Sequence, residues 1–282
     1  MPETLANIVV TAAAYSLVAV GLTTIYGVLR VLHIAHAGVY AFGAYCGYTA
    51  YTFTGSFWVA FAGAAAGAAL LGVAIFWLVY RPLLAQPRAI PLLASIGLFI
   101  MITALLARPF LLGPDIHALP ASSGLPALAG LSSIQVTIVV VAVLAVVGVY
   151  LLVRRTRLGL SWRAITADAQ MAAGNGVNLD AGITANFAIG SALAGVAALL
   201  TAVYTNSVTA SMGDVISYKA FVIVVLGGLG SVPGAVAASF LLAAAEIVST
   251  RYAGSFLPRD AIAFLVLILV LLARPQGMVS RA

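Results

Sequence analysis

The sequence predicts an all-α, polytopic transmembrane helix bundle of about eight spans, with a broken or re-entrant segment near residues 217–250. Of the 282 residues, 63% are hydrophobic and only 7% are charged. This composition excludes an ordinary soluble domain. Uncharged stretches such as 4–28 are longer than the roughly 20 apolar residues that cross a bilayer. We therefore treat residues 1–282 as one transmembrane domain, with a polar cytoplasmic loop at 154–180.

Seven spans follow directly from the apolar stretches. We expect them at 5–28, 33–53, 57–80, 90–112, 134–153, 181–206 and 259–273. Between residues 217 and 250 the chain is apolar but interrupted by the motif GGLGSVPG. This interruption predicts two half-segments or a re-entrant hairpin, because non-helical backbone at membrane depth needs a covering of protein or a water-filled cavity.

Small residues recur within the spans. Gly43 and Gly47 are four residues apart, as are Gly63 and Gly67. Faces of this kind let the backbones of neighbouring helices approach closely. The pattern predicts a tightly packed bundle.

The basic residues indicate the orientation. They lie at the ends of apolar spans, so the net charge of +6 reflects the positive-inside rule and not nucleic-acid binding. One side of the membrane, the cytoplasmic one, receives Arg30, Arg81, Arg88, the cluster Arg154 to Arg163, Arg274 and Arg281. The N-terminus then lies outside, the C-terminus lies inside, and residues 217–250 must enter and return or cross twice.

Catalytic motifs are missing from the sequence. It contains no HExxH, CxxC or GxSxG, and because Lys219 is the only lysine there is no Walker A motif. We expect no metal site, no catalytic residue and no ATP hydrolysis by this chain. What remains is transport, with the energy supplied from elsewhere.

A first candidate site lies between 31 and 45, which is polar for its position. On a helix, His33, His36 and Tyr40 would share one face, and Tyr45 would lie deeper. This face either lines a gate or translocation path, or it places histidines at the interface and tyrosines in an aromatic belt. Polar groups inside a bundle usually mark function, but interfacial ones need not.

A second candidate is the glycine motif itself, formed by Gly227, Gly228, Gly230 and Ser231. Glycine permits positive φ and close approach of backbones. Two interpretations stay open. The motif is either a broken helix whose backbone faces a cavity or a tight cytoplasmic turn between two spans.

Glu246 is the one acidic residue well inside an apolar stretch. It is a candidate proton or ion site. Alternatively, it caps the end of a half-segment or pairs with Arg251. The ion-site interpretation would make the chain an ion-coupled secondary transporter.

The polar stretch 154–180 predicts a short helix. Ser161 is its expected N-cap, Trp162 to Ala173 its body, and Gly174 its stop signal. The small apolar face of this helix suits close packing against another protein. A helix that only lay on the membrane would have larger apolar residues.

Four blocks of sequence together resemble the LivH-type permease subunit of branched-chain amino acid ABC importers. They are GLTTIYGVLRVL with the following AH and YxxGAY (21–45), TRLGLSWRAITAD (156–168), VLGGLGSVPGA (225–235) and ARPQG (273–277). The resemblance extends over nearly the whole chain.

The resemblance implies a multi-pass protein of the bacterial inner membrane that works in a complex. The implied partners are a LivM-like second permease, two cytoplasmic ATPases that bind ATP and Mg²⁺, and a periplasmic or anchored solute-binding protein. It also implies that the loop at 154–180 couples to the ATPases. The implied coupling residues are Ser161, Trp162, Arg163, Ala164, Asp168 and Gly174.

The chain departs from the family pattern in one place. His33, Ala37 and Gly38 stand where the family commonly has Asn, Gly and Glu. The missing acidic residue leaves the solute open among leucine-type amino acids, other amino acids, urea, short amides and aromatic acids.

Overall fold

A computed structural model describes residues 2–113, 115–120, 122, 125–128, 130–252, 259–273 and 278. Within these residues the regular structure is helical, with connecting loops and two isolated β-bridges, which confirms the predicted all-α class. The elements are α1 (Pro2–Leu29), α2 (His36–Thr54), α3 (Phe57–Ile75), the π-helix η1 (Phe76–Tyr80), α4 (Arg81–Leu83), α5 (Ala89–Leu106), α6 (Ser133–Arg155), α7 (Arg157–Ala167), α8 (Ala169–Gly174), α9 (Leu179–Thr205), α10 (Met212–Gly227), α11 (Val232–Tyr252) and α12 (Arg259–Ala273).

Six helical stretches in the described part of the chain are long and apolar enough to cross a membrane. They are Glu3–Leu29, Phe57–Leu83, Ala89–Leu106, Ser133–Arg155, Leu179–Thr205 and Val232–Arg251. The helices α10 and α12 also belong to the bundle, but with 16 and 15 residues they are shorter than a full span. The predicted count of about eight spans is therefore approximate.

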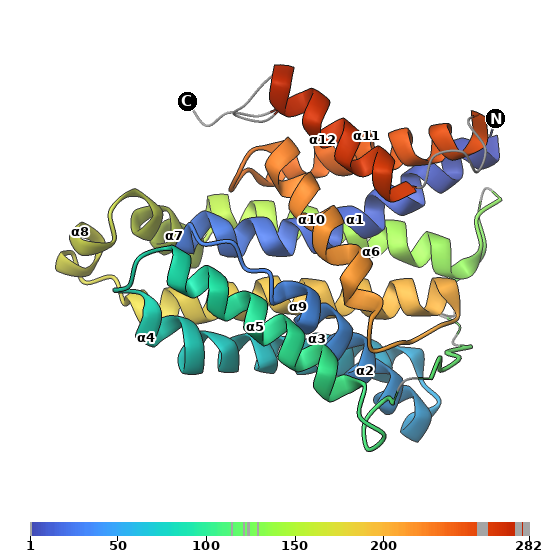
Figure 1. Ribbon diagram of the computed structural model, residues 1–282, viewed down its shortest axis with the longest axis horizontal. Coiled ribbons are helices and arrows are strands. Elements are labelled where there is room, and N and C mark those ends of the chain that lie inside the picture. The colour runs from blue at the N-terminus through green and yellow to red at the C-terminus, as the bar shows by residue number, and fades with distance from the viewer. Residues whose placement is uncertain are drawn as a thin grey trace.

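The bundle is built around α1 and α9. Of these two spans, 72% and 67% respectively are buried within the chain, against 22% for α5 and for α6. The helix α9 packs against α1, α2 and α3, and α1 packs against α11 on its other side. In Figure 1 the α10 ribbon crosses the long direction of α1 and α9 at a steep angle, while α7 and α8 project at one end of the bundle.

The predicted close approach of helices is present where α2, α3 and α9 meet. A methyl group added to Gly43 of α2 would lie 2.4 Å from Cα of Gly195 in α9. One added to Gly195 would lie 2.4 Å from the carbonyl oxygen of Ala64 in α3. These obstacles are backbone atoms, so a side chain at either position would push the helices apart.

We expect Gly43→Ala to destabilise the protein by about 1–3 kcal/mol, because overpacking shifts backbone. The matched control is Gly148→Ala in α6, where an added methyl group meets nothing within 4 Å. The control should leave stability unchanged or raise it by up to about 1 kcal/mol, the usual helix preference for alanine over glycine. Thermal unfolding in detergent compares the two, and equal midpoints would contradict the packing argument.

The glycine motif forms the turn between α10 and α11. Gly228 and Gly230 have φ of +94° and +85°, which L side chains rarely adopt. A methyl group on Gly234 would collide with the carbonyl oxygen of Gly227, so the two helices diverge from a backbone contact. The turn lies beside the C-terminal end of α1, where Gly27 faces Gly230.

Candidate functional site

The polar stretch forms two helices, α7 and α8, and not the single predicted helix. The helix α7 begins at Arg157, and its N-cap is Thr156, whose side chain accepts a hydrogen bond from Gly159 N. Ser161, the predicted N-cap, lies inside α7 and donates its hydroxyl to the carbonyl of Arg157 (3.0 Å). The prediction was wrong because Thr156 lies at the end of α6 and caps the next helix directly.

Asp168 separates the two helices. Its backbone is extended, and its Oδ1 accepts a hydrogen bond from Met171 N at 2.9 Å, which caps α8. The turn after α8 contains Gly176 with φ of +83°. Gly174 ends α8 and is exposed.

Trp162 anchors α7 to the bundle. Its side chain is only 3% exposed, and its Nε1 donates a hydrogen bond of 2.8 Å to the carbonyl of Gly182 in the first turn of α9. Ile165, one turn further along α7, is also buried and lies beside Gly182. Arg163 donates from Nη1 to the carbonyl of Val153 (2.9 Å) near the C-terminal end of α6. Trp162 and Arg163 thus fix α7 to its neighbours.

Three large apolar side chains of α7 and α8 are exposed, which the sequence did not predict. Leu158, Leu160 and Met171 are 43%, 59% and 68% exposed. Ala172 is buried, and Ala164 is half-buried. The prediction left out Leu158 and Leu160 because its helix began at Trp162, after both leucines.

A hydrogen-bonded link joins α7 to the end of α1. The hydroxyl of Thr166 donates to the carbonyl of Gly27 at 3.0 Å. Arg30 donates from Nη2 to the carbonyl of Thr166 at 2.8 Å. Arg30 itself has a left-handed backbone (φ +54°) and ends α1. The position of α7 is therefore coupled to the start of the segment that follows α1.

That segment, residues 30–35, is not helical and runs back along α1. His36, which follows this segment, lies beside Gly21, about two turns before the C-terminal end of α1. A methyl group added to Gly21 would lie 3.2 Å from Nε2 of His36. Ser95 of α5 forms hydrogen bonds with two backbone groups of this segment. Its Oγ accepts from Ile34 N (3.0 Å) and donates to the carbonyl of Leu32 (3.4 Å). Irregular backbone within a transmembrane bundle is tolerated only where protein or a cavity covers it.

The expected common helix face of His33, His36 and Tyr40 is wrong in one respect, because α2 begins only at His36. His33 precedes the helix, and its Nδ1 lies 2.8 Å from the hydroxyl of Tyr80. Tyr40 is buried, and Tyr45 is half-buried with its ring beside that of Phe42.

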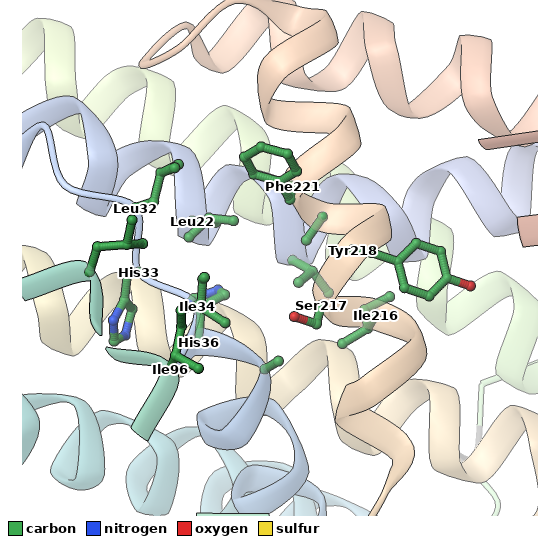
Figure 2. Close-up of a pocket in the computed structure, with 14 residues that line it drawn as sticks. Leu22, Leu32, His33, Ile34, His36, Ile96, Ile216, Ser217, Tyr218 and Phe221 are labelled. Carbon is green, nitrogen blue, oxygen red and sulfur yellow. The ribbon is translucent and has the colours of Figure 1, made fainter. Parts of the chain in front are cut away.

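A cavity of about 330 Å³ lies where the non-helical segment meets α1, α5 and α10. Both histidines line it, whereas Tyr40, Tyr45 and the glycine motif do not. In Figure 2, Leu22 approaches from α1, Phe221 and Ser217 from α10, and His36 from the opposite side. The fourteen lining residues are Val18, Leu22, Leu32, His33, Ile34, His36, Ala37, Leu92, Ile96, Ile216, Ser217, Tyr218, Ala220 and Phe221.

Glu246 pairs with Lys219 and not with Arg251. The Nζ of Lys219 lies 2.9 Å from Oε1 and 3.0 Å from Oε2 of Glu246, and both side chains are buried. The hydroxyl of Tyr15 donates to Oε2 at 2.8 Å. Arg251 instead donates to the hydroxyl of Thr4. The network joins α10 to α1 and α11, and sequence reasoning missed it because the partners are far apart in the chain.

Comparison with known proteins matches residues 4–273 to the family described as "Branched-chain amino acid transport system / permease component". The chain is 33% identical to the high-affinity branched-chain amino acid transport system permease protein BraD of Pseudomonas aeruginosa, covering 99% of this chain and 95% of BraD. It is 31% identical to the corresponding LivH of Escherichia coli K12, covering 98% and 94%. The LivH of Salmonella typhimurium is 32% identical with the same coverage. The chain therefore belongs to the branched-chain amino acid transport permease family and is a multi-pass inner-membrane protein.

Proposed function

We propose that this chain is the permease subunit of an ATP-driven ABC importer for branched-chain or other hydrophobic amino acids, or related small solutes. A LivM-like second permease, two cytoplasmic ATPases and a periplasmic or anchored solute-binding protein complete the transporter. ATP and Mg²⁺ belong to the ATPases, and this chain carries no catalytic residue. Relatives that are named permease proteins of branched-chain amino acid transport systems support this assignment.

The proposal rests mainly on the hydrogen bonds that connect α7 to the start of the non-helical segment, which lines the cavity. The helix α7 exposes Leu158 and Leu160, which are available to contact a partner. On its inward side it is hydrogen-bonded, through Thr166, to Gly27 and Arg30. Movement of α7 with an ATPase would pull on the non-helical segment that lines the cavity.

In the proposed transport cycle, ATP stabilises one of two forms of the transporter more than the other. ATP binding draws the two ATPases together and moves α7, and the bundle changes between outward-open and inward-open forms. Such coupling requires the nucleotide to favour one form over the other. Right-side-out membrane vesicles that contain all the subunits and are loaded with ATP, with the solute-binding protein outside, test this. Uptake should follow ATP supplied on the cytoplasmic side and persist when proton and sodium gradients are collapsed.

The alternative is an ion-coupled secondary transporter that uses Glu246, because ionisable residues inside membranes are usually functional. In that case uptake would follow the ion gradient without ATP. The ion pair with Lys219 weighs against a freely exchanging ion site, since the carboxylate already has a cationic partner.

Asp168 provides a test of the coupling loop. Asp168→Ala removes the N-cap of α8 and should cost about 1 kcal/mol of local stability. We expect the complex to assemble and hydrolyse ATP while solute uptake per ATP falls. Asp168→Asn is the matched control, because Asn caps helices as well as Asp does. If Asp168 acts by capping α8, the Asn variant should take up solute like the wild type. Unchanged coupling in the Ala variant would argue against α8 as part of the coupling loop.

A further inference from the structure

A second cavity, of about 480 Å³, lies where α7 meets the ends of α1, α6 and α11. Arg30, at the end of α1, and Arg163, on α7, both line it. Both residues are exposed, so a ligand can reach their guanidinium groups. Within the part of the chain that the structure describes, none of the ten residues that line this cavity is acidic. The cavity therefore presents two positive charges and no negative one.

Backbone carbonyls fix the two arginines but leave most of their donors free for a ligand. Nη2 of Arg30 donates to the carbonyl of Thr166 at 2.8 Å, and Nη1 of Arg163 donates to the carbonyl of Val153 at 2.9 Å. A guanidinium group has five N–H donors, so each arginine can form further hydrogen bonds. Neither arginine forms an ion pair with a described residue. Two guanidinium groups held in this way suit a phosphate, whose oxygens accept paired hydrogen bonds.

An apolar groove of about 310 Å³ adjoins the cavity, and Val232 at the start of α11 lines both. Val146 and Tyr150 of α6 line the groove, and Val153 lines the cavity. Their spacing of four and three residues places these side chains on one face of α6. Val236, one turn into α11, forms the opposite wall. The groove thus continues from the cavity along α6 for about 10 Å.

The positive cavity and the apolar groove together indicate an amphiphilic ligand. A third charge lies at the groove, because the guanidinium of Arg154 is placed over the ring of Tyr150, 4.8 Å from its centre. Basic pockets between transmembrane helices on the cytoplasmic side commonly bind the headgroups of anionic lipids. A free phosphate would match the cavity but would leave the groove unfilled.

We propose that the cavity and the groove together bind one anionic phospholipid of the inner membrane. Arg30 and Arg163 bind its phosphate, and one of its acyl chains lies in the groove between α6 and α11. Because Arg30 ends α1 and Arg163 belongs to α7, the bound headgroup also strengthens the attachment of α7 to the bundle. The site goes beyond the proposed transport function and does not depend on it.

Lipid titration of the delipidated, assembled transporter, followed by native mass spectrometry, tests the charged part of the site. We expect Arg163→Gln to raise the Kd for phosphatidylglycerol about fivefold, and Arg30→Gln with Arg163→Gln to raise it about 25-fold. Phosphatidylcholine with the same chains should bind the wild type as weakly as phosphatidylglycerol binds the double variant. Arg163→Lys keeps the charge and should retain most of the affinity.

Arg157→Gln is the matched control for charge. It removes one positive charge from the same helix, but Arg157 lines neither the cavity nor the groove. The Kd for phosphatidylglycerol should therefore stay unchanged. Co-purification with the other subunits checks that each variant still assembles.

Val147→Trp tests the groove without a change of charge. Val147 lines the groove and is 48% exposed, so an indole there can fill the groove without disturbing the core. The variant should bind phosphatidylglycerol about tenfold more weakly, because each buried methylene contributes about fourfold to binding. Binding of glycerol 3-phosphate, which has no acyl chain, should not change.

Three results would overturn the lipid site. The first is equal binding of phosphatidylglycerol and phosphatidylcholine, or an equal loss of affinity in the Arg157→Gln control. The second is displacement of the lipid by glycerol 3-phosphate together with no effect of Val147→Trp, which would identify the ligand as a free anion. The third is lipid that binds the purified full chain but is absent from the assembled transporter, which would assign this face to a partner subunit.

Discussion

Replacing either member of the buried Lys219–Glu246 pair alone is expected to cost about 3–5 kcal/mol of stability, because the remaining charge stays buried without a partner. The variants Glu246→Leu and Lys219→Met should therefore give little folded protein and a strongly lowered unfolding temperature. The double variant, which replaces both charges by apolar side chains, should recover most of the loss or exceed the wild type. Thermal unfolding in detergent and the yield of monodisperse protein measure these differences.

The exposed ion pair between Arg81 and Asp180 provides the matched control. Its atoms are 2.8 Å apart, close to the 2.9 Å between Lys219 and Glu246, but the two side chains are 48% and 38% exposed. Solvent screens exposed pairs of this kind, so Asp180→Ala should change stability only slightly. If Glu246→Leu lowered stability no more than Asp180→Ala does, the argument that burial makes loss of the Lys219 pair costly would be wrong.

The double variant also distinguishes the two transport mechanisms. If Glu246 is structural, a complex with Lys219→Met and Glu246→Leu should still take up solute with ATP. If Glu246 carries the coupled ion, the same complex should fold and yet lose uptake. Loss of uptake in a stable complex would therefore count against our preferred function.

Trp162→Ala is expected to release α7 from the bundle. It removes a buried indole, which typically costs about 3–5 kcal/mol, together with the hydrogen bond to the carbonyl of Gly182. Because α7 would then move without pulling on α1, the complex should hydrolyse ATP but lose most of its solute uptake. Trp162→Phe keeps much of the apolar packing and should lie between the wild type and the Ala variant.

Trypsin provides a structural readout for the same variant. The arginines at positions 154, 155, 157 and 163 lie in or beside α7, so a loosened α7 should be cleaved faster than in the wild type. Leu160→Ala is the matched control, because Leu160 is on the same helix but exposed. It should leave the cleavage rate unchanged and affect only partner binding. Equal cleavage of the Trp162→Ala variant and the wild type would show that Trp162 does not hold α7 in place.

The sequence by itself determined the class of the protein and the approximate location of its polar parts. Spans could be found because a helix in lipid needs a long apolar stretch, a property of contiguous residues. The stretch 154–180 was found as an interruption of this pattern. Its internal division was not, because Ser161, Thr156 and Asp168 are all good cap residues and only the fold decides which of them begins a helix.

Only the tertiary structure decided which polar residues meet. Lys219 and Glu246 are separated by 26 intervening residues and Tyr15 lies much earlier, so no local pattern could pair them. The path of residues 30–35 also depends on a distant residue, since Ser95 satisfies their backbone and allows the chain to leave the helical path. Periodicity describes the faces of one helix, whereas the cavity at His36 is formed where several helices and a non-helical segment converge.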